Sequence, residues 1–446
     1  MTSKCSLAYE EVLSTGRLNS DNYTLADFHS LESNDIFAKT IPQYWYIYDY
    51  KEKGYYSHQR PLLSACKNRV TVKDPWTGEI REMIMMASNN YLGLITHPKV
   101  IEAGIDAYKK YGTGASSAPL LSGTFDITRE VELKIAGFKG AEDALVFSTG
   151  YSANVGAISA LLRPGDVAIV DKLDHASILD GCRLSGAEMA VFKHQDMNSL
   201  EKCLKRCEGK FKGKLIIVDG VYGMDGDICP LPEIKKLADR YGAKVMVDDA
   251  HATGVIGKTG RGTAEHFNME GEVDLILGTL SKSLGGVGGF VASTKEVINY
   301  LRFYSRSYFF SAALPPSICA TVKAAIEVME AEPERVQQLQ NNVKYLHDTL
   351  SGSGFNVSPP GTGALSVIIG DELLMRKISK RIHDLGLYIN PLPFPSVKKN
   401  EARFKFSLMA THTRQDLDEA ADIFKKACGE FGMSNERIPV KERHSA

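Results

Sequence analysis

The chain has 446 residues, of which 43% are hydrophobic and 24% are charged, and its formal net charge at pH 7 is −1. This length predicts one large and one small domain, and the near-zero charge without a basic aromatic stripe excludes nucleic acid as the expected partner. No run approaches the ~20 apolar residues of a spanning helix, and residues 1–20 lack the apolar core of a signal peptide, so we expect a cytoplasmic protein without a membrane span.

Residues 1–60 are interpreted as an N-terminal extension that is first polar and then aromatic, with a cluster from Tyr44 to Tyr56. Aromatic clusters usually serve burial and interfaces, so we expect the extension to pack on the body of the protein or on a partner subunit. A lid or a wall for an acyl chain is the alternative.

Residues 61–315 are expected to form the large domain. Short apolar runs alternate there with helical patterns such as Leu231 to Tyr241, which has Pro230 before it and Gly242 just after it. Several runs lack polar alternation, as strands buried on both faces do. The pattern predicts an α/β fold with a mostly parallel sheet, whose sites lie at the carboxyl ends of the strands. The expected strands are 144–147, 167–170, 189–192, 215–218, 244–247, 275–277 and 289–292.

Residues 316–446 are expected to form a linking helix and a smaller α+β domain. The linking helix opens at Pro316 and reaches roughly Ser351, and the charged tail from Ser434 is expected to be frayed. The expected strands are 364–369, 388–391 and 403–409, and the expected helices are 372–385 and 414–431.

Three reactive side chains follow predicted strands of the large domain. Lys282 stands among hydroxyl residues and glycines, and Asp248 and His251 belong to the run Val-Asp-Asp-Ala-His. An amine, a carboxylate and an imidazole are what a pyridoxal 5'-phosphate (PLP) enzyme needs: the amine forms the Schiff base and the carboxylate pairs with the pyridinium nitrogen. A solvated lysine, a helix cap and a metal site are the alternatives, but no further cluster has metal-ligand spacing and the eight cysteines are scattered.

Two more segments suit such a site. His175, in the run Asp-His-Ala-Ser after a third strand, is either a turn residue or a ring that stacks on the cofactor. Gly150 lies where a strand meets a helix, and backbone N–H groups at a helix start favour a phosphate. The glycine-rich segments 112–114 and 285–289 lack the context of a nucleotide-binding motif.

Taken together, these segments resemble the α-oxoamine synthase family of PLP-dependent enzymes, over roughly residues 60–430 and in the family's order. Within that family the segments around Lys282 and Phe310 are most similar to serine palmitoyltransferase. The matching stretches are 88–94, 112–114, 121–124, 148–154, 174–177, 219–222, 224–227, 247–257, 278–284 and 310–315.

The resemblance implies a PLP-dependent transferase fold of the aspartate-aminotransferase type, fold type I, and a homodimer with shared active sites. It implies that Lys282 is the Schiff-base lysine, that His175 stacks on the cofactor, that Asp248 pairs with the ring nitrogen and that His251 contacts the ring oxygen. The remaining implied contacts are Gly150, Tyr151, Thr279 and Ser281 with the phosphate, Ser311 and Ala312 with the phosphate of the other subunit's cofactor, and Asn89 with the amino-acid carboxylate.

Two positions depart from the family's pattern. The family usually places a serine that supports the ring hydroxyl where this chain has Gly223, so His251 is left to make that contact. The family's carboxylate-binding arginine corresponds to Lys405, and lysine cannot reproduce a bidentate pair. Arg403, two residues earlier on the same predicted strand and therefore on the same face, is the other substrate-binding candidate.

The resemblance implies a decarboxylative condensation of a small amino acid with an acyl thioester, on CoA or on a carrier protein, to give an α-amino ketone, CO₂ and a free thiol. One alternative is a PLP-dependent aldolase or lyase that acts on a β-hydroxy amino acid without a thioester. Another is a non-catalytic partner subunit, although inactive members of the family typically lose the lysine and this chain retains Lys282. The sequence leaves open the acyl chain and the choice among serine, glycine, alanine and other amino acids.

Overall fold

The apolar runs of the large domain pair into one seven-stranded sheet with the strand order β3-β9-β8-β7-β6-β4-β5. The computed structural model describes residues 3–433. β9 runs antiparallel to β3 and β8, whereas the other neighbours are parallel. The strands are β3 (Asp143–Phe147), β4 (Val167–Asp171), β5 (Glu188–Phe192), β6 (Lys214–Asp219), β7 (Lys244–Asp248), β8 (Leu275–Thr279) and β9 (Gly289–Ser293), so all seven predicted strands are present.

Helices cover both faces of this sheet, which explains why its strands are apolar on both sides. On β6, Ile217 packs with the cluster of α5 and α6, whereas the next residue back, Ile216, packs with that of α7 and α8. α8 begins after Pro230 and ends at Gly242, whose φ of 60° is left-handed, as the sequence predicts. The helices of this part are α3 (Pro98–Tyr111), α4 (Asp126–Lys139), α5 (Gly150–Leu161), α6 (Ala176–Ser185), α7 (Met197–Cys207), α8 (Leu231–Tyr241), α9 (Thr263–His266), α10 (Lys295–Tyr304) and α11 (Arg306–Phe309).

The predicted linking helix is two helices, α12 (Pro316–Ala331) and α13 (Glu334–Gly352). The break falls at Pro333, which has no N–H to continue the helix. α12 packs against α3 and α4 of the large domain, and α13 packs against α15 of the small one. The small domain contains β10 (Ala364–Gly370), α14 (Glu372–Asp384), β11 (Leu387–Tyr388), β12 (Asn390–Leu392), β13 (Ala402–Ser407) and α15 (Arg414–Glu430), with β13 central in the sheet β10-β13-β12.

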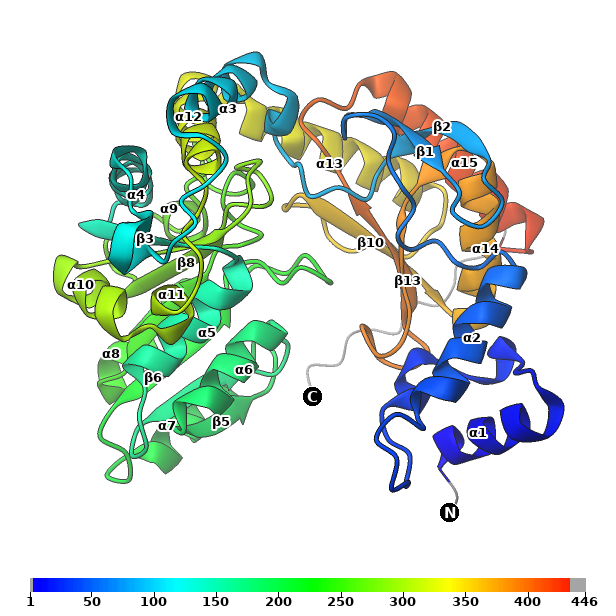
Figure 1. The fold of residues 1–446 in the computed structure, drawn as a ribbon, viewed down its shortest axis with the longest axis horizontal. Helices are drawn as coiled ribbons and strands as arrows, with labels where there is room; N and C mark the ends of the chain where they lie inside the picture. Colours follow the sequence, from blue (N-terminus) through cyan, green and yellow to red (C-terminus); the bar gives the residue numbers. More distant parts are fainter. Residues whose placement is uncertain (1–2, 434–446) are drawn as a thin grey trace.

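Two strands within residues 61–315, the range expected for the large domain, lie beside the elements of the small one. β1 (Arg69–Lys73) and β2 (Ile80–Met85) form a hairpin, and β11 adds to β2 in parallel. Figure 1 shows β1 and β2 beside α14 and α15, away from the seven-stranded sheet. The domain bounds stay a prediction, and the pairing of β2 with β11 joins segments about three hundred residues apart in the chain.

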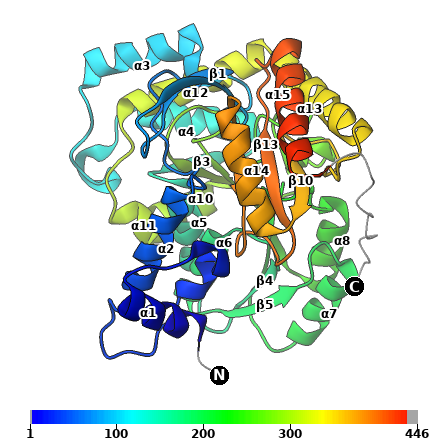
Figure 2. The same cartoon turned by 90° about the vertical axis from the view of Figure 1, so that its right-hand side faces the viewer.

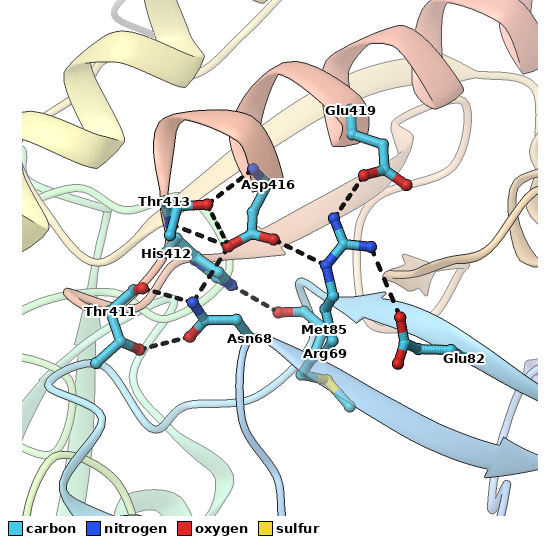
Figure 3. Close-up of polar contacts among 9 residues, drawn as sticks. All are labelled: Asn68, Arg69, Glu82, Met85, Thr411, His412, Thr413, Asp416 and Glu419. Atoms are coloured by element: carbon cyan, nitrogen blue, oxygen red, sulfur yellow. Dashed lines mark hydrogen bonds and ion pairs between the residues drawn. The ribbon is translucent and has the colours of Figure 1, made fainter.

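A polar network ties this hairpin to the turn after β13 (Figure 3). His412 accepts from the Met409 N–H at Nδ1 (3.0 Å), so its Nε2 donates to the Met85 carbonyl (3.1 Å). Arg69 reaches α15 by a 3.1 Å contact from Nε to Asp416. His412 is thus a structural residue that fixes the end of β13, the strand that carries Lys405.

The N-terminal extension folds as α1 (Lys4–Thr15) and α2 (Thr40–Glu52), which share an apolar cluster. Figures 1 and 2 show both helices at one end of the molecule, on the side of α14. Arg376 of α14 is buried against them and donates to the carbonyls of Ser20 (3.0 Å) and Tyr23 (3.1 Å) and to the Tyr46 hydroxyl (2.9 Å). The extension therefore packs on the small domain.

Within residues 3–433 no helix is long and apolar enough to cross a membrane. The tail from Ser434, for which fraying is expected, lies outside the described residues.

Replacing Arg376 by methionine tests how the extension is held. Two backbone carbonyls and a tyrosine hydroxyl lose a buried, charged donor, so we expect a loss of about 3 kcal/mol and a lower thermal unfolding midpoint. Limited proteolysis should then cut within residues 1–60 first. Lys380→Met on the same helix removes only an exposed pair with Asp384 and should change stability little. Equal stability of the two variants would contradict this account of docking.

Candidate active site

The carboxyl ends of three parallel strands bring the predicted reactive groups together. Asp219 at the end of β6 lies in register with Asp248 at the end of β7, and Lys282 follows β8 by three residues. Burial lowers the pKa of the Lys282 amine to about 8, while the carboxylates of Asp248 and Asp219 act in the opposite direction. The site therefore holds a lysine that is partly neutral near pH 8, as a reactive amine requires.

Asp248 is held by two hydrogen bonds and is linked to His175 through a buried amide. Its Oδ1 accepts from the Ala250 N–H (2.9 Å), and its Oδ2 accepts from the Asn154 side chain (2.7 Å). The same Asn154 nitrogen donates to Ser177 Oγ (3.0 Å), which lies 2.7 Å from His175 Nδ1. His175 caps the start of α6, so helix and network fix its ring together.

His251 lies in the turn after β7 and is held from the other side. The Tyr91 hydroxyl donates to Asn89 (3.1 Å), so the 2.9 Å contact between Tyr91 and His251 places the imidazole proton on Nδ1. Burial, together with the positive charges of Lys282 and Lys405, holds the pKa of His251 well below its usual value. His251 is therefore neutral and presents Nε2 as a hydrogen-bond acceptor.

Gly223 packs directly against that nitrogen. A Cβ atom at position 223 would lie 2.4 Å from His251 Nε2, which is closer than two such atoms approach in proteins. The imidazole thus occupies the space that a serine side chain would need. The absence of a side chain at position 223 is therefore matched by the position of His251.

The hydroxyl groups after β8 face the start of α5. Thr279 Oγ1 lies 2.7 Å from Ser281 Oγ, and a Cβ on Gly150 would be only 3.2 Å from Thr279. The first N–H groups of a helix have no partner within it, so Gly150 and Tyr151 offer backbone donors here. The Tyr151 side chain is exposed and bonds to Asp180 instead.

Ser311 lies beside the start of α5 of the same chain. Its Oγ is 3.3 Å from Ser148 Oγ, and the neighbouring Ala312 is exposed. The described chain thus places Ser311 at the edge of the hydroxyl cluster and leaves Ala312 open to contact from outside.

Arg403 and Lys405 both lie on β13 but differ in what they contact. The Arg403 guanidinium pairs with Asp225 and with Glu401. Lys405 is 8% exposed, and no hydrogen bond or ion pair of its amine occurs within residues 3–433. Burial and the charge of Lys282 lower the pKa of Lys405 to about 8. Of the two candidates, only Lys405 has its cation available to a ligand.

A group of carboxylates lies beneath the site. Burial and the neighbouring acids raise the pKa of Asp174 and of Asp219 well above the usual value. Burial opposes the charge of His194, but its contacts with Asp171 (2.9 Å) and Asp227 (3.4 Å) prevail and raise the pKa of His194 to about 9. Within the described range, no group of three or more His, Cys, Asp or Glu has the geometry of a metal site.

A surface pocket of about 760 Å³ opens between the β1–β2 hairpin and the start of α15. Asn90 and Gly93 line it, but neither Lys282 nor Asp248 does. Its Arg69 is already paired with Asp416 and Glu419 (Figure 3). The reactive groups lie at the strand ends and not in this pocket.

Sequence reasoning missed four residues that hold the reactive ones: Tyr91, Asn154, Ser177 and Asp219. All four lie inside the motifs that carry the resemblance, which was the available signal. Their roles depend on contacts between distant segments, such as the pair Asn154 and Asp248.

A model of the aminotransferase class I and II family matches residues 81–424. The chain belongs to this family. The chain is 43% identical over 413 residues to 4-hydroxy-2,2'-bipyrrole-5-methanol synthase PigH of Serratia sp., which covers 93% of this chain and 63% of that protein. It is 44% identical over 346 residues to 8-amino-7-oxononanoate synthase of Thermoanaerobacter pseudethanolicus, which covers 78% of this chain and 88% of the relative.

The similarity to known proteins also holds for the three-dimensional fold. A solved structure of serine palmitoyltransferase with PLP is 33% identical, covers 90% of this chain and 100% of its own, and superposes with a TM-score of 0.85. The α/β fold and the resemblance predicted from the sequence are therefore confirmed. The chain spans about two thirds of the PigH relative, 63%, and most of the synthase relative.

Proposed function

We propose that this protein binds PLP and condenses a small amino acid with an acyl thioester, on CoA or on a carrier protein, releasing CO₂ and a free thiol. The observation that carries the proposal is the meeting of Lys282, Asp248, His251 and His175 at adjacent strand ends in a chain of this family. The relatives named as synthases and the serine palmitoyltransferase structure support it.

The side chains present fit PLP. A Cβ on Gly289 would meet the Gly150 backbone at 2.6 Å, so glycines there let the helix start, Thr279 and Ser281 form one cradle of donors for a phosphate. Asp248 supplies the carboxylate for a ring nitrogen, and the lone pair of His251 Nε2 suits a ring hydroxyl. When bound, PLP would accept the electrons released at the substrate's α-carbon.

Lys282 would hold the cofactor's aldehyde carbon and then act on the amino acid. Once free, the neutral Lys282 amine would be the base that removes the Cα proton, and a pKa of about 8 makes about half of the amine neutral at pH 8 and a smaller part of it near pH 7. Asp248 is fixed by two donors, so its charge stays where a ring nitrogen is expected. His175 orients the reactants.

Lys405 would receive the carboxylate of the amino acid. Its ammonium group is buried, lacks a partner among the described residues and lies close enough to Lys282 for their charges to interact. Arg403 is held by two carboxylates and would have to give them up. Asn89, whose side chain reaches the Tyr91 hydroxyl, is the second polar contact in this proposal.

The protein would work as a homodimer. Large apolar side chains are exposed next to Ser311, among them Phe310 (72% exposed) and Leu121 (78% exposed). A hydrogen bond of 3.0 Å from the Ala313 N–H to the Ser117 carbonyl joins their two segments into one surface. Such an apolar patch beside the hydroxyl cluster suits a second copy that completes the site.

A cytoplasmic location stays a prediction from the sequence. All eight cysteines are free thiols, and seven of them are buried. Unpaired thiols are the usual state in a reducing compartment.

The dimer proposal predicts that Phe310→Asp together with Leu121→Asp gives a monomer, because each charge would enter the apolar contact. Light scattering measures the mass, with the 49.0 kDa chain as the monomer reference. Leu184→Asp, an exposed apolar residue on α6, is the control. A wild-type chain that is itself monomeric at working concentration would contradict the proposal.

The absorption spectrum near 400 nm, titrated with a panel of amino acids, tests the function. We expect a band from bound PLP, a shift with one small amino acid, and thiol release that depends on that amino acid and on an acyl thioester. Lys282→Ala should change the band, because no Schiff base with the protein can form, and reduce turnover by at least about a thousandfold. Cleavage of a β-hydroxy amino acid without thioester would point to an aldolase, and no band after PLP addition would point to a partner subunit.

The pH dependence of amino-acid binding tests Lys405. Below about pH 8 its amine is charged and attracts the carboxylate, and above that pH the charge and the affinity are lost. Lys405→Met should weaken the amino-acid Kd about 10- to 100-fold, since a charged hydrogen bond contributes about 1.5–3 kcal/mol. Lys405→Arg should bind without the loss above pH 8, because arginine stays charged.

The control for this pair is Lys398→Met, which alters an exposed amine on the loop before β13. It should leave both the Kd and its pH profile as in the wild type. If Lys405→Met bound the amino acid as tightly as the wild type, Lys405 would not be the carboxylate contact.

A further inference from the structure

The buried side-chain amide of Asn154 connects two reactive groups, the Asp248 carboxylate and the His175 imidazole. Asn154 of α5 is 2% exposed, and its Nδ2 donates to Asp248 Oδ2 at 2.7 Å and to Ser177 Oγ at 3.0 Å. An amide nitrogen has two hydrogens, so both are used. Its own carbonyl oxygen is buried and has no hydrogen-bond partner within residues 3–433.

The Asp248 carboxylate determines which way the Asn154 amide faces. If the group were turned over, the carbonyl oxygen would lie against the Asp248 carboxylate, and two acceptors would repel each other. This orientation leaves Oδ1 without a hydrogen bond, which is unfavourable for a buried polar atom. A buried amide that gives up one of its own hydrogen bonds in order to make two others points to a role for those two.

The second of these bonds determines where His175 carries its proton. Because Ser177 Oγ accepts from Asn154, its own hydrogen is directed to His175 Nδ1 at 2.7 Å. The Ser177 backbone N–H also points to Nδ1, at 3.3 Å. With two donors on Nδ1, the proton of the neutral ring lies on Nε2.

We propose that Asn154 is a positioning residue of the site, which through one nitrogen fixes the Asp248 carboxylate and, through Ser177, keeps His175 as an Nε2–H donor. The catalytic consequence of this inference rests on the proposed function. An Nε2–H donor can bind an oxygen of the substrates, but it cannot remove a proton with that nitrogen. It assigns opposite tautomers to the two histidines, since His251 carries its proton on Nδ1.

Two variants separate the branches. Asn154→Ala removes both bonds, whereas Ser177→Ala removes only the branch to His175 and leaves the contact with Asp248. Far-ultraviolet circular dichroism and thermal unfolding show whether each variant is folded. If Asn154→Ala does not fold, Ser177→Ala still tests the histidine branch.

The histidine branch is measured by ¹⁵N NMR of the histidine-labelled protein without cofactor or substrate. The His175 signals are identified by their loss in His175→Gln. We expect a protonated Nε2 and an unprotonated Nδ1 in the wild type, and a larger Nδ1-protonated fraction in both variants. A wild-type ring with its proton on Nδ1, or an Asn154→Ala spectrum equal to the wild type, would overturn the proposal.

The Asp248 branch is measured by titrating the protein with PLP and following absorption. Asn154→Ala should weaken the affinity about tenfold or more, and Ser177→Ala should change it less than about twofold, since a hydrogen bond to a charge is lost only in the first. Equal losses in both variants would overturn the separate roles. A wild type that binds no PLP would refute the proposed function, and the tautomer result alone would then decide the assignment of Asn154.

Discussion

The register of the parallel strands β6, β7 and β8 is the constraint on which the site depends. It places Asp219 beside Asp248 and lets the segment after β8 return Lys282 to the same edge. The contacts from α5 and α6 add to this edge, because their first turns begin where β3 and β4 end. A shift of one residue in any of these strands would turn its last side chain to the opposite face of the sheet and dissolve the group.

Such a group is stable only if its buried charges balance. The lowered pKa values of Lys282 and Lys405 reflect burial of two amines, and the raised pKa values of Asp174 and Asp219 reflect burial of acids close to other acids. His194, whose pKa is raised to about 9, adds a positive charge next to Asp171 and Asp227. The amines and the acids of this edge thus partly compensate one another's charge.

The sequence predicts the strand ends that carry the site well, because the patterns that indicate these strands and helices are local. Strands buried on both faces appear as uninterrupted apolar runs, and α8 is bounded by Pro230 and Gly242. The parts that it misses depend on distant partners: β2 pairs with β11, Arg403 is held by Asp225, and Asn154 contacts Asp248. Glu401 lies in the same segment as Arg403, but nothing in that segment indicates the second partner, Asp225. One long helix is expected from Pro316 to about Ser351, and the structure has two helices there, separated at Pro333. A proline is also typical of the first turn of a helix, so its presence alone does not indicate a break.

If Lys405 binds the substrate carboxylate as proposed, other residues must fix the orientation of that carboxylate. A guanidinium group grips a carboxylate at two points and fixes its plane, whereas an ammonium group attracts it from any direction. In the proposed function, donors elsewhere would then fix the plane of the carboxylate, and an Nε2–H on His175 would suit this. The rigidity of His175 would matter more beside a lysine than beside an arginine. That rigidity comes from Ser177 and Asn154, and so from the same nitrogen that holds Asp248.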